Sequence, residues 1–287
     1  MTTYSLDSLN AANDAEFTAA LGDIFEHSPW VAQQAAQRRP FSTLKDLHDA
    51  MMAALRAAPA ETRLALVKAH PDLAGKAARS GAMTADSVSE QGSVGLDRLT
   101  DAEYARFHRL NDAYQEKFGI PFIVCVRRHT RDSILHQFER RLAHDIEAER
   151  SAALTEIGLI TRLRLVALVD GPGVPITTGR LSTHVLDTVT GRPAPGVRIT
   201  LHEIGATARA QLLETVTNAD GRTDAPLMSG VPLPIGTYEL TFHMGDYFGG
   251  GGFIDVVPIR FSIAEPEAHY HVPLLVTPWS YTTYRGS

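Results

Sequence analysis

Apolar residues recur at spacings of three and four through the first 169 positions, as they do on the buried face of an α-helix. One such stripe covers 44–55. A second stripe over 104–118 follows a capping box and ends at Gly119, a residue that commonly stops helices. The same spacing continues from 134 to 163. Amphipathic packing accounts for these stripes, so they are predicted to form the core of an all-helical unit.

Beyond residue 181 the apolar period changes to two, the spacing of strands with one buried face. Clusters of Gly, Pro, Asn and Asp separate the alternating segments, as expected for turns. The predicted strands cover 181–187, 197–204, 212–217, 237–243, 256–263 and 269–276. Regularly spaced short strands predict a β-sandwich. The expected fold class is therefore a multidomain chain, all-α and then all-β.

The stretch 170–180 separates the two patterns and consists largely of turn formers. Only five of the 16 prolines and seven of the 22 glycines precede it, although it lies well past the middle of the chain. Such a rise in the frequency of proline and glycine indicates that one architecture ends and another begins. We predict domains over 1–169 and 181–287, joined by a Pro/Gly linker over 170–180.

Composition and charge limit the classes of molecule that this protein is expected to bind. The net charge is −6 and no basic stripe is present, which argues against nucleic acid as the main partner. No apolar run is long enough to span a bilayer, and the N-terminus lacks a secretory pattern. The single cysteine, Cys125, cannot form an internal disulfide. A cytoplasmic protein acting on small molecules is expected, with no membrane partner.

Three segments interrupt the helical pattern. His70 precedes Pro71, which disfavours the α conformation and places the imidazole at a helix end. The segment 87–92 is polar, and 118–126 is a β-branched run introduced by Gly and Pro. Taken alone, each has an ordinary explanation: a capping histidine, a loop and a buried connector.

Together these segments resemble 2-oxo-4-hydroxy-4-carboxy-5-ureidoimidazoline (OHCU) decarboxylase over roughly 5–170, with Arg164 in the last helix as a further match. The resemblance implies that His70 is the general acid/base and that Glu90 orients it or the substrate. The implied substrate contacts are Pro71, Ser87, Gln91, Arg164 and the backbone N–H groups of Phe122, Ile123, Val124, Cys125 and Val126.

The implied chemistry suits these residue types. Loss of CO₂ leaves electron density that donors in the site must stabilise, so no cofactor is needed. A histidine then delivers a proton to one face of the product. Arg164 offers a planar fork for a carboxylate or ureido group.

In the second half, polar residues share strand faces. His184 lies on the face of Ser182, and His269 shares a face with His271. A histidine pair of this kind is a possible metal site, but spacing identifies no third ligand. Arg222 follows a tight turn, where a solvated arginine would be ordinary.

Residues from about 181 to the C-terminus resemble 5-hydroxyisourate hydrolase, a transthyretin-related enzyme; the matches are 181–188, 220–224, 271–278 and the terminal Tyr-Arg-Gly-Ser. The resemblance implies a site of His184, Arg222 and His271, closed by Tyr284 and Ser287. One histidine would take a proton from water while Arg222 stabilises the oxyanion. Which histidine is the base stays open. Relatives of this type imply a homo-oligomer, either a dimer or a tetramer.

The two resemblances name consecutive steps of urate degradation. They imply hydrolysis of 5-hydroxyisourate to OHCU and decarboxylation of OHCU to (S)-allantoin, without cofactor or metal. Alternatives are a transthyretin-like ligand-binding protein with a helical partner-binding domain, a metal-dependent amidohydrolase using His269 and His271, and a chain in which one domain has lost catalysis.

Overall fold

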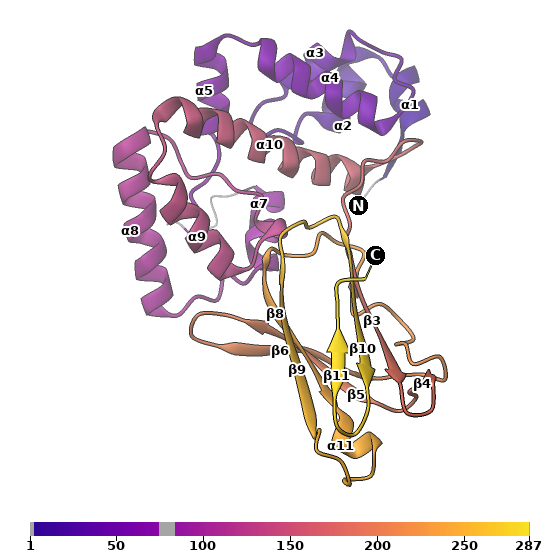
Figure 1. The fold of residues 1–287 in the computed structure, drawn as a ribbon. Coiled ribbons are helices and arrows are strands. Elements are labelled where there is room, and N and C mark those ends of the chain that lie inside the picture. The colour runs from indigo at the N-terminus through magenta and orange to yellow at the C-terminus, as the bar shows by residue number, and fades with distance from the viewer. Residues whose placement is uncertain (1–2, 75–83, 287) are drawn as a thin grey trace. The chain divides into compact units, whose positions relative to one another are not determined.

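The computed structural model describes residues 3–74 and 84–286. The chain divides into two compact units, one made of residues 1–127 and 134–177 and the other of 128–133 and 178–287. Figure 1 shows the helical unit in indigo to magenta and the β unit in orange to yellow. No helix of the described ranges is long and apolar enough to cross a membrane.

The helical unit follows the predicted stripes. Its helices are α1 (Leu6–Ala11), α2 (Asp14–Leu21), α3 (Trp30–Ala36), α4 (Leu44–Ala57), α5 (Ala60–Lys68), α7 (Ala85–Ser93), α8 (Asp101–Phe118), α9 (Arg131–Arg141) and α10 (Ile146–Leu168), with a 3₁₀ turn at Val126–Arg128. The capping box before α8 is present, and Gly119 ends α8 in the left-handed conformation at φ 65°. The longest helix, α10, packs against α4 and carries Arg164.

The β unit is a two-sheet sandwich. Its elements are β3 (Arg180–Asp187), β4 (Arg192–Pro193), β5 (Arg198–Ile204), β6 (Arg209–Val216), β7 (Met228–Ser229), β8 (Gly236–His243), α11 (Met244–Tyr247), β9 (Val256–Ile263), β10 (His269–Val276) and β11 (Tyr281–Thr283). One sheet has the order β6-β5-β8-β9; the other has β11-β10-β3-β4, with β7 also paired to β3.

Strands β3 and β10 lie side by side and parallel, although almost the whole β unit separates them in sequence. Their register aligns His271 with Ser182. Leu181 and Val185 of β3 point into the core, so the alternate residues of the strand occupy the opposite face of the sheet. The site residues of this unit therefore lie outside its core.

The all-α and all-β labels are approximate. Val169–Asp170 forms a short strand, β2, that pairs in parallel with β1 (Tyr4–Ser5) in the helical unit. The β unit contains the single-turn helix α11. Short additional strands such as β4, β7 and β11 lie in segments too brief to show a period in the sequence.

The predicted linker is anchored at both ends. Leu44 and Lys45 donate backbone hydrogen bonds to the carbonyls of Pro172 and Gly173. Gly173 has φ 64°, and a side chain there would meet Thr43 at 2.5 Å. At the other end, the N–H of Gly179 donates to the carbonyl of Val231. Residues 174–178 lie between these anchors.

Candidate active sites

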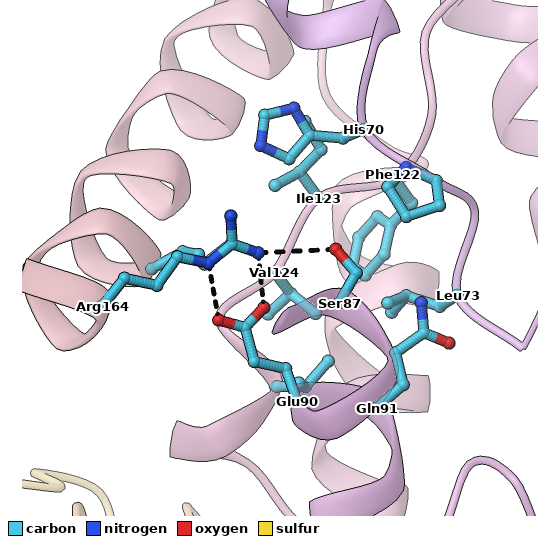
Figure 2. Close-up of a pocket in the computed structure, with 12 residues that line it drawn as sticks. His70, Leu73, Ser87, Glu90, Gln91, Phe122, Ile123, Val124 and Arg164 are labelled. Carbon is cyan, nitrogen blue, oxygen red and sulfur yellow. Dashed lines mark hydrogen bonds and ion pairs between the residues drawn. The ribbon is translucent and has the colours of Figure 1, made fainter. Parts of the chain in front are cut away.

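A pocket in the helical unit brings together segments from α5, α7, the 120–126 stretch and α10 (Figure 2). Its lining residues are His70, Pro71, Leu73, Ser87, Glu90, Gln91, Phe122, Ile123, Val124, Val126, Ile160 and Arg164. Most of the decarboxylase residues predicted from the sequence thus meet at one place. Leu73 and Ile160 were not predicted, because they carry no polar group and belong to ordinary apolar patterns.

His70 is fixed by the end of helix α5. Its Nδ1 lies 2.9 Å from the carbonyl oxygen of Leu66, one of the last turn's carbonyls. A carbonyl can only accept, so Nδ1 carries the proton and the neutral ring presents an unprotonated Nε2. Burial lowers the pKa of His70, and it outweighs the hydrogen bond to Leu66 and the charge of Glu26, which raise it. The surroundings of His70 therefore favour a neutral imidazole with its proton on Nδ1.

Glu90 and Arg164 form a bidentate ion pair inside the pocket (Figure 2). The Nε and Nη2 atoms of Arg164 each lie 2.8 Å from a carboxylate oxygen of Glu90. The remaining N–H groups point to Ser87, Glu26 and the carbonyl of Ile24. The guanidinium has five N–H donors, and each has a partner here, so Arg164 lines the pocket while it holds Glu90.

The sequence reasoning missed Glu26. Its carboxylate is buried and accepts hydrogen bonds from Arg164 at 3.0 Å, Thr84 at 2.7 Å and Ser87 at 3.3 Å. Burial raises the pKa of Glu26, but Thr84 and Arg164 outweigh it and hold the pKa below its ordinary value. The sequence signal that could have identified Glu26 is its place as an acidic residue directly after the apolar pair Ile24 and Phe25.

Only part of the predicted backbone wall lines the pocket. Four of the five residues from 122 to 126 line it, but Cys125 does not. The N–H of Cys125 donates to the carboxylate of Glu156 at 2.8 Å, so it is directed away from a ligand. The carbonyl of Ile123 accepts from Arg141, whose guanidinium also lies over the Phe122 ring. This buried arginine fixes the wall from behind.

Gln91 supports the loop that follows His70. Its side-chain oxygen accepts from the N–H of Ala74 at 2.9 Å, and its amide donates to the carbonyl of Asp72 at 3.3 Å. These bonds explain how a polar side chain can be almost fully buried beside Pro71. The resembling stretch continues through Gly75 and Lys76, which lie outside the described residues.

The β unit brings its three predicted catalytic residues together. His184 and Arg222 form an isolated bridge between backbones, and the Arg222 charge acts on both His184 and His271. Burial and Arg222 lower the pKa of His184, although the backbone of Asp220 lies close enough to the ring to raise it. Nε2 of His184 is buried and has no hydrogen-bond partner within the described ranges.

The surroundings of His184 and His271 favour the neutral form of each imidazole. Burial and then the Arg222 charge lower the pKa of His184. The pKa of His271 is lowered by the same two causes and by its neighbours His269, His184 and Arg180. Neutral imidazoles beside a guanidinium provide a base next to a fixed positive charge.

The C-terminal segment closes on His271 through backbone. The N–H of Gly286 donates to the His271 carbonyl at 2.8 Å, and a side chain at Gly286 would meet the His271 ring at 2.6 Å. Tyr284 is 58% exposed, and no hydrogen bond or ion pair among residues 84–286 links it to the three site residues. Ser287, the other predicted closing residue, lies outside the described residues.

The histidine pair of β10 does not gather a ligand set. Ring nitrogens of His269 and His271 each contact the hydroxyl of Ser182, at 2.9 Å. Among residues 3–74 and 84–286, no group of three His, Cys, Asp or Glu side chains could hold a metal. The structure therefore contains hydrogen-bonded imidazoles where the sequence allowed a metal pair.

Comparison with known proteins accounts for both units. The OHCU decarboxylase family matches residues 10–166, and the HIUase/transthyretin family matches residues 181–286. A 5-hydroxyisourate hydrolase from Deinococcus radiodurans is 55% identical over 113 residues, which are 37% of this chain and 95% of that protein. The chain belongs to both families.

Further relatives of the two families cover one unit or the whole chain. A decarboxylase from Haloferax volcanii, 2-oxo-4-hydroxy-4-carboxy-5-ureidoimidazoline decarboxylase, is 41% identical over 165 residues, or 58% of this chain and 96% of that protein. The crystal structure of (S)-allantoin synthase is 36% identical and covers 99% of this chain and 100% of its own, with a TM-score of 0.53. That solved protein is thus similar to this chain along both units.

Proposed function

We propose that the chain is a bifunctional enzyme of urate degradation. The β unit hydrolyses 5-hydroxyisourate to OHCU, and the helical unit decarboxylates OHCU to (S)-allantoin. The observation that supports this most strongly is the match of each unit to one enzyme family, together with a similar (S)-allantoin synthase along nearly the full chain. No cofactor takes part in either proposed step.

In the proposed hydrolysis, a neutral histidine takes a proton from water as the water oxygen bonds to the cyclic amide carbonyl. The positive charge of Arg222 stabilises the developing oxyanion. The C–N bond then breaks, and the departing nitrogen receives a proton. His184 and His271 are the candidates for these transfers because both are held neutral beside Arg222.

In the proposed decarboxylation, the bond to the carboxylate breaks and its electron pair stays on the ring. Nε2 of His70 accepts the proton of the neighbouring hydroxyl and returns a proton to the ring carbon, which fixes the handedness of the product. Glu90, held by Arg164, lines the same pocket as a negative charge. Its position disfavours a bound carboxylate more than the neutral CO₂ that leaves.

A homo-oligomer, dimer or tetramer, is part of the proposal. The β unit exposes large apolar side chains, among them Phe253, Trp279 and Tyr281, and such groups are typical of association surfaces. Light scattering on the eluting peak of a sizing column tests this. A mass of one chain would contradict it.

A cytoplasmic location is also proposed, and cell fractionation tests it.

The function itself is tested with freshly prepared 5-hydroxyisourate. Ultraviolet absorbance follows consumption of the substrate and of the intermediate, and circular dichroism reports the optical purity of the allantoin. We expect both steps to be accelerated and the product to be the S form. Binding without turnover would favour the alternative of a transthyretin-like binding protein.

A further inference from the structure

Ser182 lies between two imidazoles on the outer face of its sheet. Its Oγ is 2.9 Å from Nε2 of His269 and 2.9 Å from Nδ1 of His271. The parallel register of β3 and β10 sets His271 opposite Ser182 and places His269 two residues before it. The ring centres of the two histidines are 6.2 Å apart, so the hydroxyl bridges them. Ser182 is buried, whereas His269 is exposed.

A hydroxyl has a single hydrogen, so it can donate to only one of the two imidazoles and must accept from the other. When Ser182 donates to His269, Nδ1 of His271 carries a proton and its Nε2 is bare, which is the form of a base. When Ser182 donates to His271, Nε2 of neutral His271 carries the proton, which is the form of an acid. The direction in which the Ser182 hydroxyl donates therefore decides whether His271 is in the form of a base or of an acid.

We propose that Ser182 and His269 form a proton relay between His271 and solvent. After Nε2 of His271 has taken a proton, the Nδ1 proton moves to the Ser182 oxygen. The hydroxyl proton moves at the same time to Nε2 of His269, and the Nδ1 proton of His269 leaves to water. To reset the bridge, Nε2 of His271 gives its proton to the departing nitrogen, a proton from water returns to Nδ1 of His269, and the two transfers through Ser182 run in reverse. This inference rests on the proposed hydrolase function.

The two halves of the reaction make opposite demands on His271. Attack of water delivers a proton to the ring, and departure of the nitrogen takes a proton from it, so a path that exports one proton and later returns it keeps His271 neutral between the two. Cations and imidazoles surround His271: Arg180 and His184 on β3, His269 on β10, and Arg222 beside the turn. On the terminal segment, Arg285 lies over the Tyr270 ring. These neighbours lower the pKa of His271, so a proton gained there is readily passed on.

The test uses the full chain and the initial rate of 5-hydroxyisourate consumption. Ser182→Ala interrupts the relay, Ser182→Thr keeps its hydroxyl, and His269→Ala removes its outer member. Ser262→Ala, on an exposed position of β9, is the matched control. Each rate is measured at constant pH and ionic strength with increasing imidazole, a small base that can replace the missing ring.

We expect kcat of Ser182→Ala to fall about tenfold, below the usual range for losing a general acid or base, with little change in KM. Ser182→Thr should recover most of the rate and Ser262→Ala should match the native chain. For His269→Ala we expect a rate that is low in dilute buffer and rises with imidazole, while the native rate stays constant. A structural role would give no buffer dependence.

Unchanged rates in Ser182→Ala and His269→Ala would overturn the relay, as would losses that imidazole does not affect in a folded His269→Ala chain. Thermal unfolding of the same preparation, compared with the native chain, checks the integrity of the β unit in each variant. If Ser182→Ala does not fold, the imidazole response of His269→Ala decides. A native chain without hydrolase activity would instead overturn the proposed function, so the two failures are distinguishable.

Discussion

The two units place their histidines by different physical means. In the helical unit, one buried guanidinium holds Glu26 and Glu90, and a helix-end carbonyl orients His70. In the β unit, strand register aligns the imidazoles, and Arg222 is the cation that acts on both His184 and His271. The first site depends on a balance of buried charges, and the second on backbone geometry. Substitutions should therefore affect the two activities separately and in different ways.

The largest expected effect is at His70. His70→Ala removes the base without altering the β unit, so decarboxylation should slow about 10²- to 10⁴-fold while hydrolysis continues. OHCU should accumulate and the allantoin should lose its optical purity, because uncatalysed decay has no preferred face. Absorbance and circular dichroism in one reaction measure both. His136→Ala, at an exposed position of α9, is the control.

Arg222→Ala should slow hydrolysis about 10²- to 10³-fold, the usual cost of losing an oxyanion donor. Decarboxylation of preformed OHCU should be unchanged. Arg192→Ala, an exposed arginine of β4, controls for the loss of charge. Loss of both activities in a folded Arg222→Ala chain would contradict two separate sites.

Glu26→Gln tests whether the negative charge of this carboxylate keeps Arg164 and Ser87 in position in the helical site. The substitution keeps the shape but weakens a charged hydrogen bond to Arg164, worth about 1.5–3 kcal/mol. Decarboxylase kcat should fall about tenfold or more, by that same energy, and hydrolysis should not change. Glu116→Gln, exposed on α8, is the matched control. Equal rates in Glu26→Gln and native chains would show that Arg164 and Ser87 are positioned without this carboxylate.

The pH dependence should be mild over the neutral range. His184 and His271 have lowered pKa values, so their neutral forms persist below the ordinary histidine value of about 6.5. The acid limb of kcat/KM for hydrolysis should therefore have its midpoint below about pH 6.5. Because the folded state binds fewer protons, their contribution to stability is present above that pH and is lost as pH falls through the lowered values. A midpoint above 6.5 would contradict this tuning.

Lengthening the linker should have the smallest effect. A Gly/Ser insertion between Val174 and Pro175 leaves the anchors at Gly173 and Gly179 in place. Both separate activities should remain at native levels. If OHCU passes quickly between the units, its transient level in the coupled reaction should rise with the insertion. An unchanged transient would show that the covalent link does not assist transfer.

Much of this molecule could be predicted from local patterns. The helical and strand periods indicated both architectures, and motif resemblance identified most of the residues that line the helical pocket. Local patterns could not show that β3 and β10 are parallel neighbours, because strand pairing between distant segments leaves no periodic signal. The bridge from Ser182 to both histidines follows from that pairing and was therefore missed.

The sequence also could not show which acceptor each hydrogen-bond donor meets in the folded chain. Arg164 lines the pocket, but its donors bond to Glu26 and Glu90, which lie 138 and 74 residues away from it in the chain. Likewise, the N–H of Cys125 is taken by Glu156. Residue type indicates which bonds a group can form, whereas the tertiary fold decides with which partner.

The anchored linker sets a local concentration. Only residues 174–178 separate the bond at Gly173 from that at Gly179, and five residues span at most about 17–18 Å. Together with residues 128–133, which belong to the β unit, this short connection keeps one unit at an effective concentration on the order of millimolar around the other. Dilution of the enzyme does not lower that value. If OHCU passes between the units, its transfer should therefore depend less on enzyme concentration than transfer between two separate proteins would.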